Sequence, residues 1–512
     1  MRVVTPAATI LDTVTQHASA NPSGIAFADI STGNELSWSD YLSRAATLAS
    51  DIIDRVVTER ERVALLVPDG IAAHVTFLAC EIAGVVALGM GSKSGDREIM
   101  HLLERTDARL LVTTARDAGR LRRISPVAVL VLDESAGTTS AAGRRPARSP
   151  FTLDELWFLN STSGTTGLPK VVRHHQRRWS EFHTLALDAG RLTTADAFSS
   201  LVPAPFGFGL WTSHFTPTLL GSPCVVADRF DAAATLAAIE QHRITVLAAV
   251  PTQLALLMSS SEFGERDLSS LRVVFTGGEM LPYERGVEFE DRTGAALLQF
   301  YGSNETGALS RTTLDDSRDV RLRTAGRLIS GMQVRLVDDN DLDVSSTGGP
   351  AVPCCKGPLL SLGYDADDAA NAALYTRDGW MKMGDLVTIS PASEFPMAND
   401  AVLTVVGRTA DLIIRGGKNI SAPQVEEEAS SHPAIALVAV AAVPDPVFGE
   451  RVCAYAVLKD GTSLTLAELT GHLGQRGVGK DLWPELLVIV EGDLPRNAGG
   501  KVAKHALGAL RH

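Results

Sequence analysis

A loop rich in glycine and hydroxyl residues is the part of the chain best suited to chemistry. Residues 161–170 read Ser-Thr-Ser-Gly-Thr-Thr-Gly-Leu-Pro-Lys and follow an apolar run at 156–159. Such a loop can direct many backbone N–H groups and hydroxyls toward one anion, and Lys170 adds a positive charge. The loop lacks the Gly-Lys-Ser/Thr ending of a Walker A motif, which disfavours a P-loop kinase or GTPase. The pattern therefore predicts an anion-binding loop in preference to a flexible surface turn.

The loop is similar to the phosphate loop of the adenylate-forming superfamily, which contains acyl-CoA synthetases, adenylating ligases, peptide-synthetase adenylation domains and beetle luciferases. Further motifs of that family recur in the same order over nearly the whole chain. The resemblance implies an AMP-forming acid–thiol ligase that uses ATP, Mg²⁺ and coenzyme A. In that case the β- and γ-phosphates contact Thr162, Ser163, Gly164, Thr165, Thr166, Gly167 and Lys170.

A second motif, Tyr-Gly-Ser-Asn-Glu-Thr-Gly at 301–307, follows an apolar run at 297–300. By itself it would be read as a core tyrosine and a solvated glutamate. The resemblance implies that Tyr301 stacks on adenine and that Glu305 holds Mg²⁺, and a planar ring and a carboxylate suit these tasks. Asn304 stands where most members have Thr, and its amide can still hydrogen-bond a phosphate oxygen. A Gly-Gly-Glu segment at 277–279 is similar to the family segment that lines the adenine pocket with backbone groups. The predicted nucleotide contacts here are Gly278, Glu279, Tyr301, Gly302, Asn304 and Glu305.

Three further positions match the family's ribose and transition-state contacts. The resemblance implies that Asp385 accepts hydrogen bonds from both ribose hydroxyls, which suits a carboxylate, and that Arg408 reaches ribose or phosphate. Lys501, in Leu-Pro-Arg-Asn-Ala-Gly-Gly-Lys, matches the lysine that bridges the substrate carboxylate and the α-phosphate. A mobile cation is what the meeting of two anions requires. The predicted catalytic residues are Lys501, Thr166 and Glu305.

The family changes the arrangement of its C-terminal domain between half-reactions, and the resemblance places the hinge at Ala410. Members usually have Asp or Lys there, but a hinge needs only to absorb backbone rotation. The resemblance also implies that Gly416 and Gly417 approach the pantetheine arm of coenzyme A, which glycine permits. We therefore predict an adenylation domain at 1–408 and a mobile lid domain at 409–512.

The family's substrate carboxylate lies beside a Phe-His segment, which corresponds here to Phe206-Gly207. The missing histidine leaves the usual aromatic gate absent or supplied elsewhere, with His214 as a candidate. No aspartate that could hold a substrate ammonium occurs at 206–211, which disfavours an amino acid substrate. Small residues are expected to leave a roomy apolar cavity, although glycines are equally often plain turns. The predicted acid pocket contains Phe206, Gly207, Phe208, Gly209, Gly277, Gly302 and Ala308.

The elements that must position these residues change along the chain. Short apolar runs alternate with helical spacing over roughly the first 300 residues, as at 62–67 and 71–86, which predicts a mostly parallel sheet covered by helices. From about residue 321, short strands separated by Gly, Asp and Asn predict antiparallel β structure. The last hundred residues mix strands and helices. The predicted fold is α/β, with a large N-terminal domain of layered sheets and helices plus a β-rich part, and a small α+β C-terminal domain.

Composition narrows the function further. The chain has 512 residues, 45% of them hydrophobic, and 60 acidic against 47 basic residues give a net charge of -13. This balance disfavours a nucleic acid partner. Five cysteines without metal-ligand spacing disfavour a disulfide scaffold or a zinc site and favour a reducing cytoplasm. No long apolar run predicts a membrane span, and no secretion signal is expected at the N-terminus.

The sequence favours an acyl-CoA ligase that activates a hydrophobic, bulky or cyclic carboxylic acid with ATP and transfers the acyl group to coenzyme A. One alternative is an acyl-AMP ligase that loads a carrier protein or performs only one half-reaction, because coenzyme A and carrier arms share pantetheine. Another is a nucleotide-binding pseudo-enzyme.

Overall fold

The computed structural model describes residues 8–56, 58–132, 148–161, 169–390, 401–408, 412–415, 418–446, 448–496 and 502–510. The chain divides into two compact units. Unit 1 contains Met1–Ala248, Asn304–Gly307 and Pro358–Ala373. Unit 2 contains Ala249–Ser303, Ala308–Gly357 and Leu374–His512. The predicted domain boundary at residue 408 lies within unit 2 and stays a prediction.

The first sheet of unit 1 carries the predicted phosphate loop at one edge. Its strand order is β6-β5-β3-β4-β7-β8. The pairs up to β7 are parallel, whereas β8 runs antiparallel to β7. The loop therefore connects two antiparallel neighbours, leaving β7 after Ser161 and entering β8 at Val171. The strands are β3 Arg62–Leu66, β4 Val86–Gly89, β5 Leu110–Thr113, β6 Ala128–Val131, β7 Phe158–Ser161 and β8 Val171–His174.

A second group of strands in unit 1 has the order β11-β9-β10-β1-β2. These strands pair in parallel except for β2, which forms a hairpin with β1. Their bounds are β1 Ile25–Asp29, β2 Glu35–Ser37, β9 Phe198–Ser200, β10 Cys224–Val226 and β11 Val246–Ala248.

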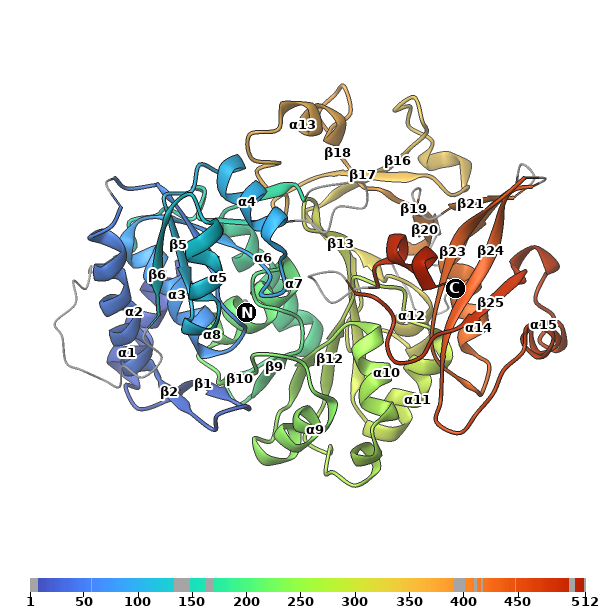
Figure 1. Ribbon diagram of the computed structural model, residues 1–512, viewed down its shortest axis with the longest axis horizontal. Coiled ribbons are helices and arrows are strands. Elements are labelled where there is room, and N and C mark those ends of the chain that lie inside the picture. Colours follow the sequence, from blue (N-terminus) through green and yellow to red (C-terminus); the bar gives the residue numbers. More distant parts are fainter. Residues whose placement is uncertain are drawn as a thin grey trace. The chain divides into compact units, whose positions relative to one another are not determined.

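The helices of unit 1 supply its apolar core. Helix α3 is buried almost throughout and packs with α2, and α5 lies against β6 (Figure 1). The helices are α1 Ile10–Ala20, α2 Trp38–Ile53, α3 Ile71–Ala83, α4 Asp96–Arg105, α5 Ala115–Ile124, α6 Gln176–Gly190, α7 Gly207–Gly209, the π-helix Leu210–Phe215, α8 Thr216–Leu220 and α9 Ala232–Gln241.

Unit 2 joins parallel and antiparallel pairing. Strands β12 and β13 are parallel, whereas the pairs β14-β15, β15-β20 and β19-β20 are antiparallel. A separate antiparallel sheet has the order β16-β17-β18. The strands are β12 Val273–Thr276, β13 Ala296–Ser303, β14 Gly307–Arg311, which begins at the edge of unit 1, β15 Arg327–Leu328, β16 Gln333–Val337, β17 Val352–Lys356, β18 Met381–Lys382, β19 Asp385–Ser390 and β20 Val402–Arg408.

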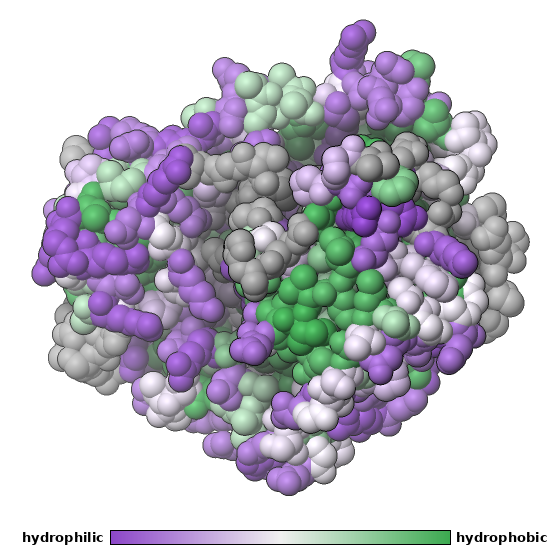
Figure 2. Space-filling model, turned by 45° about the vertical axis from the view of Figure 1, so that its right-hand side comes forward, coloured by the Kyte–Doolittle hydropathy of each residue, from purple (hydrophilic) through white to green (hydrophobic). Residues whose placement is uncertain are grey.

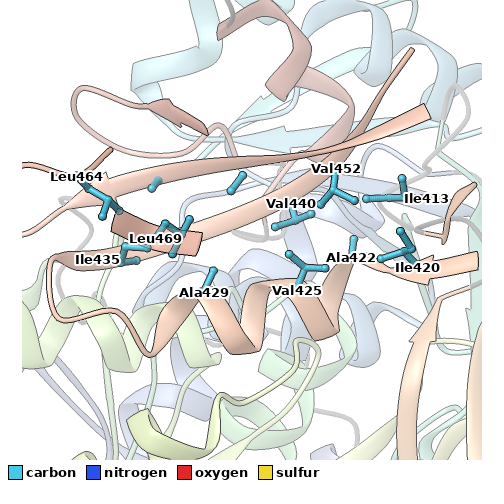
Figure 3. Packing of buried hydrophobic residues seen from close by; sticks show 12 residues of the cluster. Ile413, Ile420, Ala422, Val425, Ala429, Ile435, Val440, Val452, Leu464 and Leu469 are labelled. Atoms are coloured by element: carbon cyan, nitrogen blue, oxygen red, sulfur yellow. The ribbon is translucent and has the colours of Figure 1, made fainter. Parts of the chain in front are cut away.

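The C-terminal part of unit 2 has its own core (Figure 3). Side chains of α14, including Val425 and Ala429, point toward Val440 of β23 and Val452 of β24, and all four are fully buried. The sheet order is β22-β21-β24-β23, with β25 parallel to β24. These elements are β21 Leu412–Arg415, β22 Lys418–Ser421, α14 Ala422–Ser430, β23 Ile435–Asp445, β24 Gly449–Leu458, α15 Leu466–Gln475 and β25 Leu486–Ile489.

The remaining α-helices are α10 Pro251–Ser259, α11 Tyr283–Thr293, α12 Arg318–Arg323 and α13 Asp368–Leu374. On the face shown in Figure 2, hydrophobic side chains gather in one area and hydrophilic ones cover most of the rest. None of the helices in the described ranges combines the length and the apolar character needed to cross a bilayer.

The predicted fold class is confirmed, including the change from parallel to antiparallel pairing after β13. The segment after Phe206 differs from a simple loop, because α7 continues into the π-helix. The hydroxyls of Thr212 and Ser213 donate to the carbonyl oxygens of Phe208 and Gly209, at 2.8 and 2.7 Å. Such bonding to carbonyls four residues back competes with regular helical pairing.

Candidate active site

A tyrosine and an aspartate from distant segments of unit 2 meet at the end of β13. The Tyr301 hydroxyl donates a hydrogen bond of 2.9 Å to Oδ2 of Asp385. Asp385 is the first residue of β19, where the antiparallel register places it opposite Arg408. The structure thus brings three predicted nucleoside contacts together. Asp385 and Arg408 are paired across the β19–β20 ladder, and Tyr301 is joined to Asp385 by the hydrogen bond. An aromatic ring can stack on a nucleobase, and a carboxylate beside the ring can accept hydrogen bonds from the ribose hydroxyls.

The segment after β12 lies next to this pair in the sheet, since β12 and β13 are parallel neighbours. A side chain at Gly277 would place its Cβ 2.7 Å from the carbonyl oxygen of Phe300, so the two backbones approach closely there. Gly278 has a φ of +80°, which favours glycine. Glu279 accepts hydrogen bonds from the backbone N–H and hydroxyl of Thr252, at 3.2 and 2.7 Å. Its carboxylate therefore secures the start of α10, which leaves backbone groups for the predicted adenine contact.

In unit 1, the predicted metal-binding carboxylate is held by a residue that the sequence did not single out. The Tyr364 hydroxyl donates a 2.9 Å hydrogen bond to Oε1 of Glu305. Burial is the larger cause of a raised pKa at Tyr364, and the charge of Glu305 is the second. This hydroxyl therefore stays protonated and remains a donor. The Lys170 ammonium lies 4.9 Å from the centre of the Tyr364 ring. Tyr364 thus links the last residue of the predicted phosphate loop to Glu305.

Glu305 is a suitable protein ligand for an Mg²⁺ ion whose other ligands are mainly phosphate oxygens. Within the described ranges, no group of three or more His, Cys, Asp or Glu side chains could hold a metal by itself. Mg²⁺ commonly uses one or two carboxylates together with substrate phosphates and water. A single well-held carboxylate beside a phosphate loop fits this donor set.

Glycines of the predicted acid pocket lie close to neighbouring protein atoms. A Cβ on Gly209 would lie 2.1 Å from the carbonyl oxygen of Pro203, and one on Gly207 would lie 2.7 Å from Oδ1 of Asn304. With Gly277, three of these glycines therefore make room for neighbouring protein atoms. Ala308 is buried within β14. Close packing alone therefore explains glycine at these three positions, and the predicted acid pocket stays a prediction.

The aromatic residues of the same segment pack against one another. The Phe208 ring stacks on Trp211, with 5.7 Å between ring centres. His214, the candidate substitute for the missing histidine, is fully buried and its Nδ1 lies 3.1 Å from Nδ1 of His74. Burial lowers the pKa of His214 to about 3, so the ring is neutral. Its Nε2 has no hydrogen-bond partner among the described residues, and its role as a substitute for the missing histidine stays a prediction.

Several predicted residues lie outside the described ranges and stay predictions. Their flanking elements are described: β7 and β8 flank the phosphate loop, β20 and β21 flank Ala410, and paired Arg415 and Lys418 flank the two hinge-loop glycines. Arg496 pairs with Val502 on either side of Lys501. The residues concerned are Thr162, Ser163, Gly164, Thr165, Thr166, Gly167, Ala410, Gly416, Gly417 and Lys501, together with the side chain of Arg408.

Two protein-family models match the chain. The AMP-binding enzyme family matches residues 14–365, and the AMP-binding enzyme C-terminal domain matches residues 424–501. The chain belongs to the AMP-binding enzyme family. The predicted resemblance to adenylate-forming enzymes is thereby confirmed, and the second match begins beyond the predicted boundary at 408.

Full-length relatives of this AMP-binding enzyme include ligases with different acceptors. A medium-chain fatty-acid–CoA ligase of Escherichia coli (strain K12) is 30% identical, over 98% of this chain and 90% of the relative. A salicyl-AMP ligase/salicyl-S-ArCP synthetase of Mycobacterium tuberculosis is 30% identical, over 97% of this chain and 90% of the relative. The solved o-succinylbenzoate CoA synthetase of Bacillus subtilis, in complex with its acyl-adenylate, is 25% identical with a TM-score of 0.81, over 97% of each chain.

Proposed function

We propose that this AMP-binding enzyme is an acyl-CoA ligase. A carboxylate attacks the α-phosphorus of ATP and releases pyrophosphate, and the thiol of coenzyme A then attacks the acyl carbonyl of acyl-AMP and releases AMP. The observation that carries the proposal is the hydrogen bond from Tyr301 to Asp385, because it joins two proposed nucleoside contacts that are 84 positions apart in the chain. The ligase relatives support both half-reactions.

The chain's own residues supply binding and charge rather than a covalent nucleophile. Tyr301 stacks on adenine, Asp385 accepts from the ribose hydroxyls, and the 162–170 loop holds the β- and γ-phosphates. Lys501 neutralises the charge that develops where carboxylate and α-phosphate meet. Holding two reactants in line and matching developing charge supplies most of the rate in such reactions.

Mg²⁺ would be held by Glu305 and would neutralise phosphate charge. Tyr364 keeps the carboxylate oriented through its 2.9 Å hydrogen bond. Lys170, whose ammonium lies 4.9 Å from the centre of the Tyr364 ring, adds a second positive group near the phosphates.

The acid substrate in this proposal is hydrophobic and bulky or cyclic. The support is the pair of stacked aromatic rings of Phe208 and Trp211, together with the absence of an acidic side chain at 206–211 that could hold an ammonium. We also propose a reducing compartment such as the cytoplasm, because all five cysteines are free and buried.

The decisive experiment is incubation of the purified chain with ATP, Mg²⁺, coenzyme A and a panel of acids of graded size and ring content. Mass analysis is expected to find an acyl-CoA thioester and AMP. Formation of acyl-AMP without thioester would favour a carrier protein as acceptor, as the salicyl ligase relative illustrates. No ATP–pyrophosphate exchange with any acid would favour the nucleotide-binding pseudo-enzyme.

A further inference from the structure

Four polar side chains of unit 1 form one continuous hydrogen-bonded chain behind the Asn304–Glu305 turn. Nη1 of Arg178 lies 2.7 Å from Nδ1 of His174, and Nε2 of His174 lies 2.8 Å from Oδ1 of Asn160. Nδ2 of Asn304 donates to the same Asn160 oxygen at 2.6 Å. We call Arg178, His174, Asn160 and Asn304 the relay.

The direction of every hydrogen bond in the relay follows from chemistry. A guanidinium only donates, so Nδ1 of His174 accepts and its Nε2–H donates to Asn160. Burial is the larger cause that lowers the pKa of His174 well below its usual value, and the charge of Arg178 is the second. The low pKa agrees with a neutral ring. Nδ2 of Asn160 donates to the carbonyl oxygen of Pro205 at 3.0 Å. Both amides are therefore locked in a single orientation.

The relay is shielded from water. Arg178, His174 and Asn160 each have 0% of their surface exposed. Nη1 of Arg178 also donates to the backbone carbonyl oxygen of Asn304 at 2.9 Å. Burial lowers the pKa of Arg178 to about 9, and the charge of Glu305 opposes this shift. A buried cation requires such compensation, so Arg178 holds the turn by one hydrogen bond and by its attraction to Glu305.

The relay also determines what residue 207 can be. With Nδ2 of Asn304 bound to Asn160, its Oδ1 is directed at Gly207, where a Cβ would lie only 2.7 Å away. The ring of Trp179 would be 3.2 Å from the same Cβ. Glycine at 207 and asparagine at 304 are therefore a matched pair, and each is a departure from the family pattern described above.

We infer that the relay is a positioning element for adenylation, in which Arg178, His174 and Asn160 hold Asn304 and Glu305 in the geometry that ATP and its metal require. The inference rests on the proposed function. Arg178 acts through its neighbours without touching the nucleotide, so it is a positioning residue. Its loss misplaces Glu305 and weakens the use of Mg²⁺.

The first test compares Arg178→Met, which keeps bulk but removes the charge, with Arg178→Lys and with Arg177→Met. Arg177 is the exposed neighbour, whose side chain binds Asp154. In ATP–pyrophosphate exchange at fixed ATP, Arg178→Met is expected to raise the Mg²⁺ concentration for half-maximal rate about tenfold, with partial recovery in Arg178→Lys. An Arg178→Met curve with the same midpoint as the parent, at any lower rate, would overturn the positioning role.

The second test measures how residues 207 and 304 depend on each other by comparing melting temperatures, so it does not require enzyme activity. Gly207→Ala is expected to lower the melting temperature by about 2–4 °C in the parent and by clearly less in an Asn304→Ser background, where the overlapping amide is gone and only the tight contact with Trp179 remains. Equal shifts in both backgrounds would overturn the pairing of residues 207 and 304. A parent enzyme without exchange activity would instead overturn the proposed function, so the two failures are distinguishable.

Discussion

Single hydrogen bonds prepare the nucleotide site before any ligand enters. Tyr301 cannot stack on a base in a defined orientation unless its ring is held, and the bond to Asp385 does this while it also orients the carboxylate. Tyr364 does the same for Glu305. In each case a neutral hydroxyl donates to an oxygen that the ligand or its metal would need.

We predict that Tyr301→Phe lowers kcat/KM for ATP about tenfold. The variant keeps the ring but loses a hydrogen bond to a charged group, which contributes about 1.5–3 kcal/mol when shielded and less where water competes. ATP–pyrophosphate exchange at varied ATP measures the effect.

The matched control for this prediction is Tyr283→Phe. The Tyr283 hydroxyl also donates to a carboxylate, that of Asp319 at 2.9 Å, but at an exposed position. Equal losses in both variants would show that the Tyr301 bond has no special role in nucleotide binding.

At this scale the sequence identifies the proposed ligand contacts but not the residues that hold them in place. Tyr301, Glu305 and Asp385 stand in recognisable motifs after strands. Tyr364 and Arg178 carry no local signal, because their importance comes from contacts with Glu305 and Asn304 across more than 50 residues of chain.

At the scale of elements, the segment that enters the predicted acid pocket is defined by tight backbone contacts. Gly209 is the residue before the π-helix and has a φ of -64°, which any residue can adopt. Its requirement for glycine is steric, since the carbonyl oxygens of Pro203 and Val202 leave no space for a Cβ.

We predict that Gly209→Ala lowers the melting temperature by several degrees or prevents folding, because overpacking costs about 1–3 kcal/mol or more. The matched control is Gly119→Ala in α5, where a Cβ meets no atom within 4 Å. That change is expected to be neutral or stabilising by up to about 1 kcal/mol. Thermal unfolding followed by circular dichroism measures both, and equal shifts would contradict the steric explanation.

The same loop is anchored by a half-buried acid. Oδ1 of Asp69 accepts the backbone N–H of Ala204 at 2.7 Å. Burial raises the pKa of Asp69 from 3.8 to about 7, the hydrogen bond from Ala204 lowers it, and the charge of Asp228 adds to the rise. The folded chain therefore holds this proton more tightly than the unfolded chain, and the stability that it contributes is lost as the pH rises through about 7.

We predict that the Asp69→Asn substitution stabilises the folded chain, relative to the parent, more at high pH than at low pH. An amide keeps the acceptor for Ala204 but has no charge to bury. The melting temperature of the variant minus that of the parent is expected to be higher at pH 8 than at pH 5, whereas the surface control Asp51→Asn should show no trend. A difference that is constant over this range would contradict the account.

Sequence patterns locate most elements but not their irregular ends. The apolar run at 62–67 contains β3, and the helical spacing at 71–86 contains α3 but extends beyond its end. The π-helix was missed, because apolar spacing does not report the hydroxyl-to-carbonyl bonds that create it. Nor does composition reveal whether a glycine opens a cavity or fits against a carbonyl oxygen.

At the scale of the whole molecule, the two-step reaction requires different residues at each step. Lys501 is proposed to act only where carboxylate and α-phosphate meet, whereas the glycine loop between β21 and β22 is proposed to act in thiol transfer. The match to the family's C-terminal domain over residues 424–501 is consistent with a distinct functional region.

We predict that Lys501→Ala lowers acyl-AMP formation by at least about 100-fold, the scale of losing an electrostatic group in the transition state, while thioester synthesis from supplied acyl-AMP changes little. Quenched-flow or endpoint mass analysis of each half-reaction measures how the loss of activity divides between acyl-AMP formation and thioester synthesis. An equal loss in both half-reactions would argue against separate arrangements for the two steps.

The central claim, that the carboxylate attacks the α-phosphorus of ATP, is tested most directly with a carboxylic acid labelled with ¹⁸O at both carboxylate oxygens. After turnover with ATP and coenzyme A, the account predicts AMP that carries one ¹⁸O atom and a thioester that retains the other. Unlabelled AMP, or ADP accompanied by labelled inorganic phosphate, would contradict it.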